Sequence, residues 1–139
     1  MSGVLVNELE SHDGEISFIG YGGEDRTIIT CSWDRVIKIH MDEKQPLKKP
    51  KDYVLRGRAK AHKKDIICGD YAHNLGLIAT GGRDHKVRLW EYERVKFEDE
   101  ISAHTNEVVI VKFLKPFPLL VTADNSKTFL RGVLIVICP

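Results

Sequence analysis

Apolar and polar residues alternate with a period of two along most of the chain, in short runs separated by polar stretches. This period is typical of β-strands that bury one face, and it differs from the 3.6-residue period of an amphipathic helix. The runs predict strands at 16–21, 27–31, 36–40, 53–57, 66–71, 77–81, 87–90, 95–101, 108–113 and 119–123. We therefore expect an all-β fold with almost no helix.

The strand pattern recurs around three histidines, His12, His62 and His104, which are separated by 50 and 42 residues. Each histidine follows a small residue, and an acidic residue stands three positions after it. A threonine stands 18 residues after each histidine without any gap: Thr30, Thr80 and Thr122. A repeat of this length indicates one small unit of strands per copy, in which the copies stack on one another.

The first two copies agree at two further positions. Asp34 and Asp84 stand 22 residues after their histidines, in short polar stretches that are typical of hairpin turns. His40 and Trp90 stand 28 residues after the same histidines, at the end of the following strand.

The third copy departs from this pattern. Ser126 occupies the aspartate position, although Asp124 stands two residues earlier, and Gly132 occupies the tryptophan position. The chain from Arg131 to Pro139 then loses the alternation, and we expect an irregular tail there. Such a tail fits a misread exon boundary, or a strand that docks on a partner.

Units of about 40 residues that open on a small residue and His, and that contain Asp-x-x-apolar-x-apolar-Trp, resemble the WD-repeat β-propeller family. Residues 61–93 are close to a complete signature, and the resemblance covers roughly residues 4–126. It implies blades of four antiparallel strands. It also implies that each His binds the strand Thr, that the turn Asp orients the His, and that the Trp N–H joins the chain. The implied network contains His62, Thr80, Asp84 and Trp90, with His12, Thr30, Asp34, His104 and Thr122 in the other copies.

Three chemical alternatives compete with this structural interpretation. A Ser/Thr-His-Asp hydrolase site occurs once in a protein, whereas this set recurs at the repeat spacing. A zinc site built from the three histidines would need ligands from three different blades. The Gly81-Gly82 pair leads into a strand, so it offers no helix N-terminus to a phosphate. We therefore expect no enzymatic activity, cofactor, metal or small-molecule substrate.

The repeats predict a single incomplete propeller domain over residues 1–139. Its expected parts are the last strand of a preceding blade (1–11), a blade with a basic insertion (12–57), a second blade (58–101) and an incomplete blade (102–139). A propeller closes with about four to eight blades. We expect the other blades on a neighbouring chain or in a longer protein, and we expect this chain to be ordered only within a multi-subunit complex.

The composition and the cysteine spacing bear on the class of protein and on its cellular compartment. The chain has 139 residues, 42% hydrophobic and 29% charged, with a net charge of +1, which is typical of a globular protein. Cys31, Cys68 and Cys138 show no paired spacing, which favours a reducing compartment. The longest apolar run, 132–138, is too short to cross a bilayer. These features predict a cytoplasmic protein without a membrane anchor.

One segment, Leu47 to Lys64, concentrates positive charge. It holds eight Lys and Arg against one Asp, a net charge of +7. Such a segment is often only a solvated loop, but it also suits an acidic partner. The candidate contact residues are Lys48, Lys49, Lys51, Arg56, Arg58 and Lys60. A nucleic acid is the alternative partner; it is less expected, because Tyr53 is the single aromatic residue available for stacking.

Residues 75–93 and 113–126 look like the large WD-repeat proteins of ciliary and flagellar axonemes. This resemblance implies a non-enzymatic scaffold in the axonemal cytoskeleton. Its partners would be other protein subunits, with tubulin among the candidates.

Overall fold

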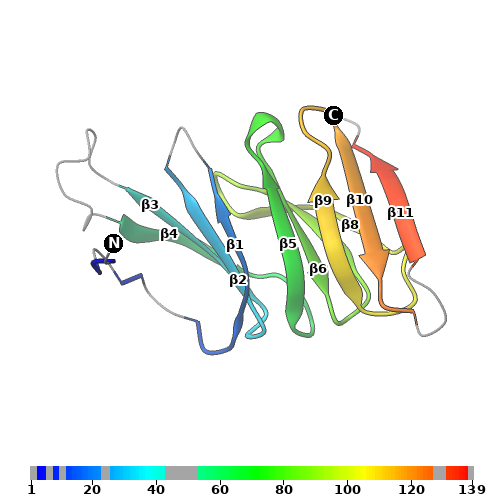
Figure 1. Cartoon of the computed structure of the whole chain (residues 1–139), viewed down its shortest axis with the longest axis horizontal. Helices are drawn as coiled ribbons and strands as arrows, with labels where there is room; N and C mark the ends of the chain where they lie inside the picture. The colour runs from blue at the N-terminus through cyan, green and yellow to red at the C-terminus, as the bar shows by residue number, and fades with distance from the viewer. Residues whose placement is uncertain are drawn as a thin grey trace.

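A computed structural model of the chain describes residues 3–5, 8–9, 12–22, 26–42, 53–126 and 131–137. Within these ranges the chain forms strands and one 3-10 turn, His73–Leu75, and no α-helix. The strands form three antiparallel sheets that stand side by side (Figure 1). The all-β, propeller-like arrangement of four-stranded antiparallel blades is therefore confirmed.

Each sheet contains strands in their order along the chain. Sheet 1 contains β1 (Ile16–Tyr21), β2 (Ile28–Ser32), β3 (Val36–Asp42) and β4 (Tyr53–Lys60). Sheet 2 contains β5 (Ile66–Ala72), β6 (Leu77–Gly82), β7 (Val87–Glu91) and β8 (Lys96–Ile101). Sheet 3 contains β9 (Val108–Phe113), β10 (Leu119–Asp124) and β11 (Arg131–Val136).

The strand at β11 corrects one expectation. The tail was expected to be irregular, but Arg131–Val136 pair with the whole of β10 in an antiparallel register. The run lacks alternation because apolar residues occupy successive positions from 133 to 137. At the opposite end of the chain, described residues 3–5 and 8–9 are not in a strand.

The register of β11 also shows which residue of sheet 3 is equivalent to Trp90. Trp90 pairs with Ile78, and His40 pairs with Ile28 at the same place in sheet 1. In sheet 3 the equivalent pair is Leu120 with Ile135. The prediction that Gly132 is the counterpart was wrong, because the connection between β10 and β11 is longer than the connections between β2 and β3 and between β6 and β7.

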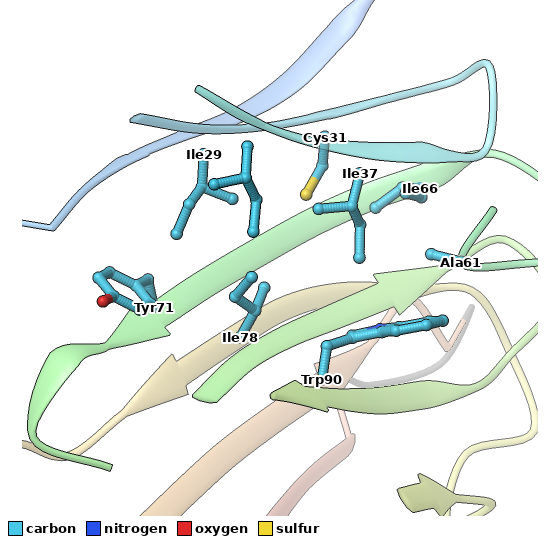
Figure 2. Close-up of a cluster of buried hydrophobic side chains, with 9 residues drawn as sticks. Ile29, Cys31, Ile37, Ala61, Ile66, Tyr71, Ile78 and Trp90 are labelled. Atoms are coloured by element: carbon cyan, nitrogen blue, oxygen red, sulfur yellow. The ribbon is translucent and has the colours of Figure 1, made fainter. Parts of the chain in front are cut away.

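The sheets pack face to face around two apolar cores. The first core joins sheets 1 and 2 through Ile29, Cys31, Ile37, Ile39, Ala61, Ile66, Tyr71, Ile78 and Trp90 (Figure 2). The second core joins sheets 2 and 3 through Ala72, Ala79, Val87, Leu89, Val108, Val111, Phe113 and Leu120. Sheet 2 is therefore covered on both faces.

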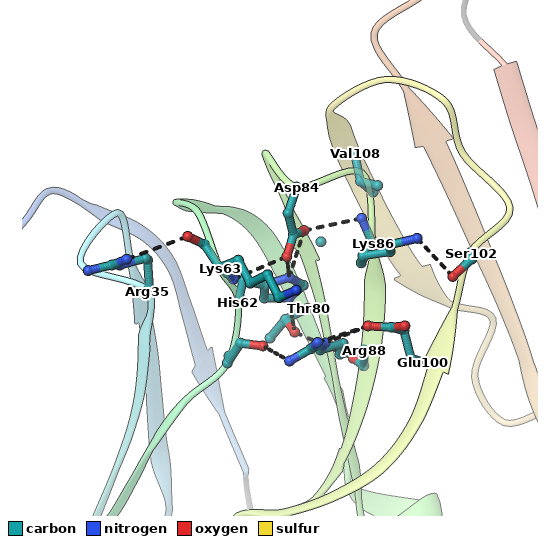
Figure 3. Close-up of polar contacts among 12 residues, drawn as sticks. Arg35, His62, Lys63, Thr80, Asp84, Lys86, Arg88, Glu100, Ser102 and Val108 are labelled. Carbon is teal, nitrogen blue, oxygen red and sulfur yellow. Dashed lines mark hydrogen bonds and ion pairs between the residues drawn. The ribbon is translucent and has the colours of Figure 1, made fainter.

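Two hairpins carry the polar turns that the repeats predict. The turns between β2 and β3 and between β6 and β7 each contain a left-handed residue, Arg35 (φ 73°) and His85 (φ 71°). Asp34 and Asp84 hold these turns closed, because their carboxylates accept the backbone N–H of the residue two positions later. Both turns lie at the same end of their sheets, beside the histidine loops (Figure 3).

Candidate functional site

In sheet 2 the predicted network is assembled around His62 (Figure 3). His62 Nε2 lies 2.7 Å from Thr80 Oγ1, and His62 Nδ1 lies 2.9 Å from Asp84 Oδ1. Trp90 Nε1 donates to Thr80 Oγ1 at 3.1 Å. His62, Thr80 and Trp90 are buried. The network thus connects the loop before β5 with β6, β7 and the turn between them.

The chemistry of the four side chains determines which group donates each hydrogen bond of this network. The Asp84 carboxylate can only accept, so His62 Nδ1–H donates to it, and in the neutral imidazole Nε2 is then an acceptor. The Thr80 hydroxyl donates to Nε2 and accepts from the Trp90 N–H. Each buried polar atom is satisfied by the next one, which removes the cost of burying it unpaired.

Sheet 1 repeats the arrangement with one exchange. His12 Nε2 lies 2.7 Å from Thr30 Oγ1, and His12 Nδ1 lies 2.9 Å from Asp34 Oδ2. His40, which is 1% exposed, takes the place of the tryptophan. The exchange keeps a buried polar ring in the second half of β3.

Sheet 3 contains a network member that sequence analysis did not assign. His104 Nε2 lies 2.7 Å from Thr122 Oγ1, and His104 Nδ1 lies 2.8 Å from Asp124 Oδ2. Asp124 thus fills the aspartate role from the end of β10, where the register with β9 shifts. Ser126, which stands at the expected position, donates its hydroxyl to Asp124 Oδ1 at 2.5 Å.

The environment of the turn aspartates favours their ionised form. Burial raises the pKa of Asp84, but the hydrogen bond and charge of His62, with the N–H groups of Lys86 and Lys63, lower it to about 2. Burial also raises the pKa of Asp34, and the N–H of Val36 and the His12 hydrogen bond bring it below its ordinary value. These carboxylates therefore act as fixed acceptors.

The same arrangement in three sheets argues for a structural role. Both ring nitrogens of each histidine are engaged by the Thr and Asp of its own sheet. No ring nitrogen of the three is left to bind a metal or take a proton from a substrate. Among the described residues, no group of three or more His, Cys, Asp or Glu is arranged to hold a metal ion.

The glycine pair beside the network has a packing role. A Cβ at Gly82 would overlap the His62 ring and the Asp84 carboxylate, and one at Gly81 would overlap Cys68 Sγ and Val108. These glycines allow the histidine loop and sheet 3 to approach β6 closely. They form no phosphate-binding loop, because they lie within β6 itself.

A surface hollow lies where the polar turns of sheets 1 and 2 meet. It is lined by Asp13, Trp33, Asp34, Arg35, Lys63, Lys64, Asp65 and Arg83. Trp33 is 41% exposed, and the Arg83 guanidinium carbon lies 5.7 Å from the centre of its ring. Arg35 donates to the Lys63 carbonyl oxygen across the gap between the sheets at 3.5 Å (Figure 3). We call these eight residues the rim hollow.

The rim hollow was not predicted as a site, although the repeat contains a signal for it. Trp33 and Arg83 both stand 21 residues after their histidines, one in each of two successive copies. Equivalent turn positions of neighbouring sheets lie side by side, so the two side chains meet. Asp65 and Glu107 hold the other side of Arg83, with nitrogen–oxygen distances of 3.5 and 3.8 Å.

The structure divides the basic segment. Lys48, Lys49 and Lys51 lie outside the described residues, whereas Arg56, Arg58 and Lys60 are on exposed positions of β4. Arg56 is engaged within the molecule: its guanidinium donates to the Glu93 carbonyl oxygen and lies 5.8 Å from the Tyr92 ring centre. Arg56 thus links sheets 1 and 2. Arg58 and Lys60 are left on the outer surface, and Lys63 and Lys64 continue from them into the rim hollow.

No helix in the described ranges has the length and apolar character that crossing a membrane requires.

Comparison with known proteins gives distant relatives of much greater length. The chain is 23% identical to Protein HIR1 of Yarrowia lipolytica over 132 residues, covering 86% of this chain and 12% of that protein. It is 26% identical to Coatomer subunit beta'-1 of Arabidopsis thaliana over 113 residues, covering 78% of this chain and 11% of that protein. The chain therefore spans a small part of these relatives.

Solved structures match the fold. The WD40 repeats of RRP9 give a TM-score of 0.70 at 15% identity, covering 83% of this chain and 34% of that one. The U3-55K structure gives 0.71 at 16% identity, covering 83% and 35%. The family model "WD domain, G-beta repeat" matches residues 3–40 and 54–91, which together are more than half of the chain. The chain belongs to the WD-repeat family.

Proposed function

We propose that this chain is a non-enzymatic protein-interaction scaffold, and that it binds an acidic segment of a partner protein at the rim hollow. The observation that carries the proposal is Trp33, a large aromatic side chain left 41% exposed in a turn and stacked against Arg83. Trp and Arg are the residues that most often dominate the binding energy of protein interfaces. The His-Thr-Asp networks hold the turns that carry both side chains.

Charge around Trp33 supports an acidic partner. Two of the three carboxylates in the hollow are already bonded, Asp34 to His12 and Asp65 to Arg83. Arg35, Lys63 and Lys64 are exposed around the same hollow. Arg58 and Lys60 extend this positive surface along β4. A partner with carboxylates around one apolar group would match both features.

A role in a larger assembly is consistent with the family. WD-repeat proteins commonly serve as scaffolds, and one relative is by name a subunit of coatomer. The whole assembly of this chain, like its cytoplasmic localisation, is a prediction. The axonemal setting and tubulin as a partner also stay predictions, and the relatives reported above add no support for them.

Peptide binding tests the rim hollow directly. Fluorescence anisotropy would compare labelled acidic peptides with a central aromatic residue against peptides in which Gln and Asn replace the Glu and Asp. We expect Trp33→Ala and the Lys63→Glu, Lys64→Glu double variant each to weaken binding at least about tenfold, roughly 1.4 kcal/mol. Lys96→Glu, on exposed β8, is the matched control and should bind normally. Unchanged binding by the hollow variants would contradict the proposal.

Two further measurements separate the more specific partners. Co-sedimentation with microtubules tests the axonemal prediction, and the Trp33→Ala variant should reduce it if the rim hollow is the contact. Titration with single-stranded oligonucleotides tests the nucleic-acid alternative, because phosphate contacts make affinity fall steeply with salt. Tight oligonucleotide binding with a steep salt dependence, together with no peptide binding, would replace an acidic protein with a nucleic acid.

A further inference from the structure

The outermost strands of sheets 1 and 2 are sheet edges of opposite charge. β4 is the last strand of sheet 1, and β8 is the last strand of sheet 2. The charged residues of β4 are all positive, whereas three of the four charged residues of β8 are negative. At such an edge, alternate residues direct their backbone N–H and C=O groups away from the sheet, where another strand can pair with them. We call these strands the β4 edge and the β8 edge.

The β8 edge is partly occupied by its own side chains. The Asp99 carboxylate accepts the backbone N–H of Glu100 at 2.8 Å, so one backbone donor of β8 is already satisfied. The Glu100 carboxylate accepts two N–H groups of Arg88, at 3.0 and 2.8 Å. On β4, by contrast, no side chain among the described residues bonds to the backbone of residues 54–60. The β4 edge is therefore the more open of the two, and β8 is a poor acidic strand for the β4 edge of another molecule.

The exposure of the positive residues follows from the position of β4 at the outside of its sheet. By strand register, Arg58 is equivalent to Glu100 of sheet 2. Lys60 and Ser102 each follow two positions later. Glu100 and Ser102 are exposed even though sheet 2 is covered on both faces. A neighbouring sheet therefore leaves these two outer positions open to a partner.

The end of the β4 edge leads directly to the rim hollow. The N–H of Ala61, the residue after β4, donates to the carbonyl oxygen of Arg35 at 2.7 Å, and Arg35 lines the hollow. Lys63 and Lys64 follow along the chain and line the same hollow. Positive side chains therefore continue from the β4 edge to the surroundings of Trp33.

We propose that the acidic partner segment binds as an added strand along the β4 edge, with carboxylates at alternate positions beside Arg58 and Lys60 and with its apolar residue on Trp33. This inference rests on the proposed function, and it adds the conformation and the charge spacing of the partner. A segment that joins a sheet edge gains affinity from backbone hydrogen bonds and specificity from alternate side chains. The β8 edge repels the same segment, because like charges placed side by side suppress the wrong pairing.

Fluorescence anisotropy with the whole chain tests the added strand. The probe is a labelled peptide in which Glu alternates with Thr and which ends in Phe for the rim hollow. Two further peptides carry N-methyl groups on all Glu residues or on all Thr residues. In an added strand only one of these sets directs its N–H groups to β4. We therefore expect one N-methylated peptide to bind at least about tenfold more weakly and the other to bind like the probe.

Variants of the two edges locate the strand. Lys60→Glu on the β4 edge should weaken binding of the probe at least about tenfold. Lys96→Glu on the β8 edge makes the same exchange on the other outermost strand and should bind normally. A shortened peptide that retains only the Phe end should respond to Trp33→Ala and not to Lys60→Glu. Both lysines are exposed, and circular dichroism checks that the variants keep the fold.

The outcomes separate this inference from the proposed function. Equal effects of the two N-methylated peptides, or normal binding of the probe by Lys60→Glu, would overturn the added strand and leave an acidic partner at the rim hollow. Failure of the alternating probe to bind, when other acidic peptides bind, would also overturn the strand alone. Failure of every acidic peptide to bind would overturn the proposed function and this inference together.

Discussion

The equivalent histidines of sheets 2 and 3, His62 and His104, each donate to an aspartate, but the two aspartates come from different places in their sheets. In sheet 2, Asp84 approaches His62 from the turn after β6, and its side chain is 9% exposed. In sheet 3, Asp124 approaches His104 from the end of β10, and both side chains are completely buried. The distances from Nδ1 to the carboxylate oxygen are nearly equal, 2.9 and 2.8 Å. The position of the carboxylate in space is thus maintained while its position in the sequence moves by two residues.

The fourth member of the network differs more. Trp90 donates an N–H to Thr80 in sheet 2, whereas Ile135 stands at the same register position in sheet 3 and has no polar atom to donate. The His-Thr-Asp unit therefore forms without the tryptophan. This comparison separates a common unit, present in all three sheets, from a fourth position that holds Trp90 in sheet 2 and the apolar Ile135 in sheet 3.

The largest expected effect is the loss of Asp124. Asp124→Ala would leave the buried Nδ1–H of His104 without its acceptor, in a place that excludes water, and we expect a loss of about 3 kcal/mol. Asp84→Ala should cost roughly 1–3 kcal/mol and less than Asp124→Ala, because water can reach the turn and replace the carboxylate. Urea denaturation of both variants measures the difference. A larger cost for Asp84→Ala would contradict the burial argument.

The next prediction concerns acid. The pKa of Asp84 is about 2 in the folded chain and lies near its ordinary value of 3.8 in the unfolded chain. Between these values the unfolded chain binds more protons, so stability falls as the pH falls. The contribution of Asp84 is complete above about pH 5 and is lost toward pH 2. Asp84→Asn should therefore destabilise at neutral pH, and the gap from wild type should close toward pH 2.

Urea midpoints of the two proteins between neutral pH and pH 2 provide the measurement. Glu98→Gln, on the exposed strand β8, is a control for removing one carboxylate without a network. A gap that stays constant over this range would mean that the Asp84 carboxylate gains nothing from His62.

A smaller effect is expected for the fourth position of the network in sheet 2. Trp90→Phe retains much of the ring but removes the N–H that Thr80 accepts, and we expect a loss of about 1 kcal/mol. A double-mutant cycle with Thr80→Val isolates the bond, because removing both partners should cost less than the sum of the single losses. Strict additivity would show that the tryptophan acts through packing alone.

The sequence was sufficient for most of the fold because its period-two runs are long and clearly bounded. β1 and β9 have the bounds that the pattern predicts, and the strands of sheet 2 are within one residue of them. The polar network of sheets 1 and 2 was also accessible, since its members recur at fixed spacing. The resemblance to WD repeats then supplied the bonding order.

Other parts of the site and of sheet 3 could not be predicted, because an alignment of the three repeats without gaps does not show them. Asp124 stands at the end of β10 itself, where Ser32 and Gly82 stand in the other sheets. Ile135 takes its position because the connection between β10 and β11 is longer than the corresponding connections in sheets 1 and 2. β11 lacked alternation, so its pairing became visible only beside β10. The rim hollow depends on Trp33 meeting Arg83 across two sheets, a contact between variable turn positions that no single repeat shows.

The smallest expected effect tests whether the turns act independently of the networks. His85 and Arg35 close equivalent hairpins at φ 71° and 73°, a left-handed conformation that costs a side-chain-bearing residue about 1 kcal/mol. Glycine adopts this conformation freely but loses more entropy on folding, so His85→Gly should stabilise by only about 0.5 kcal/mol. Arg35→Gly should give the same gain over Arg35→Ala, since both variants remove the bond from Arg35 to the Lys63 carbonyl oxygen, although sheet 1 has His40 where sheet 2 has Trp90. Thermal unfolding of each glycine variant beside the alanine variant at the same position, which keeps a Cβ, measures this. Equal gains would place the effect in the backbone of the turn, and a gain in sheet 2 alone would show that turn and network are coupled.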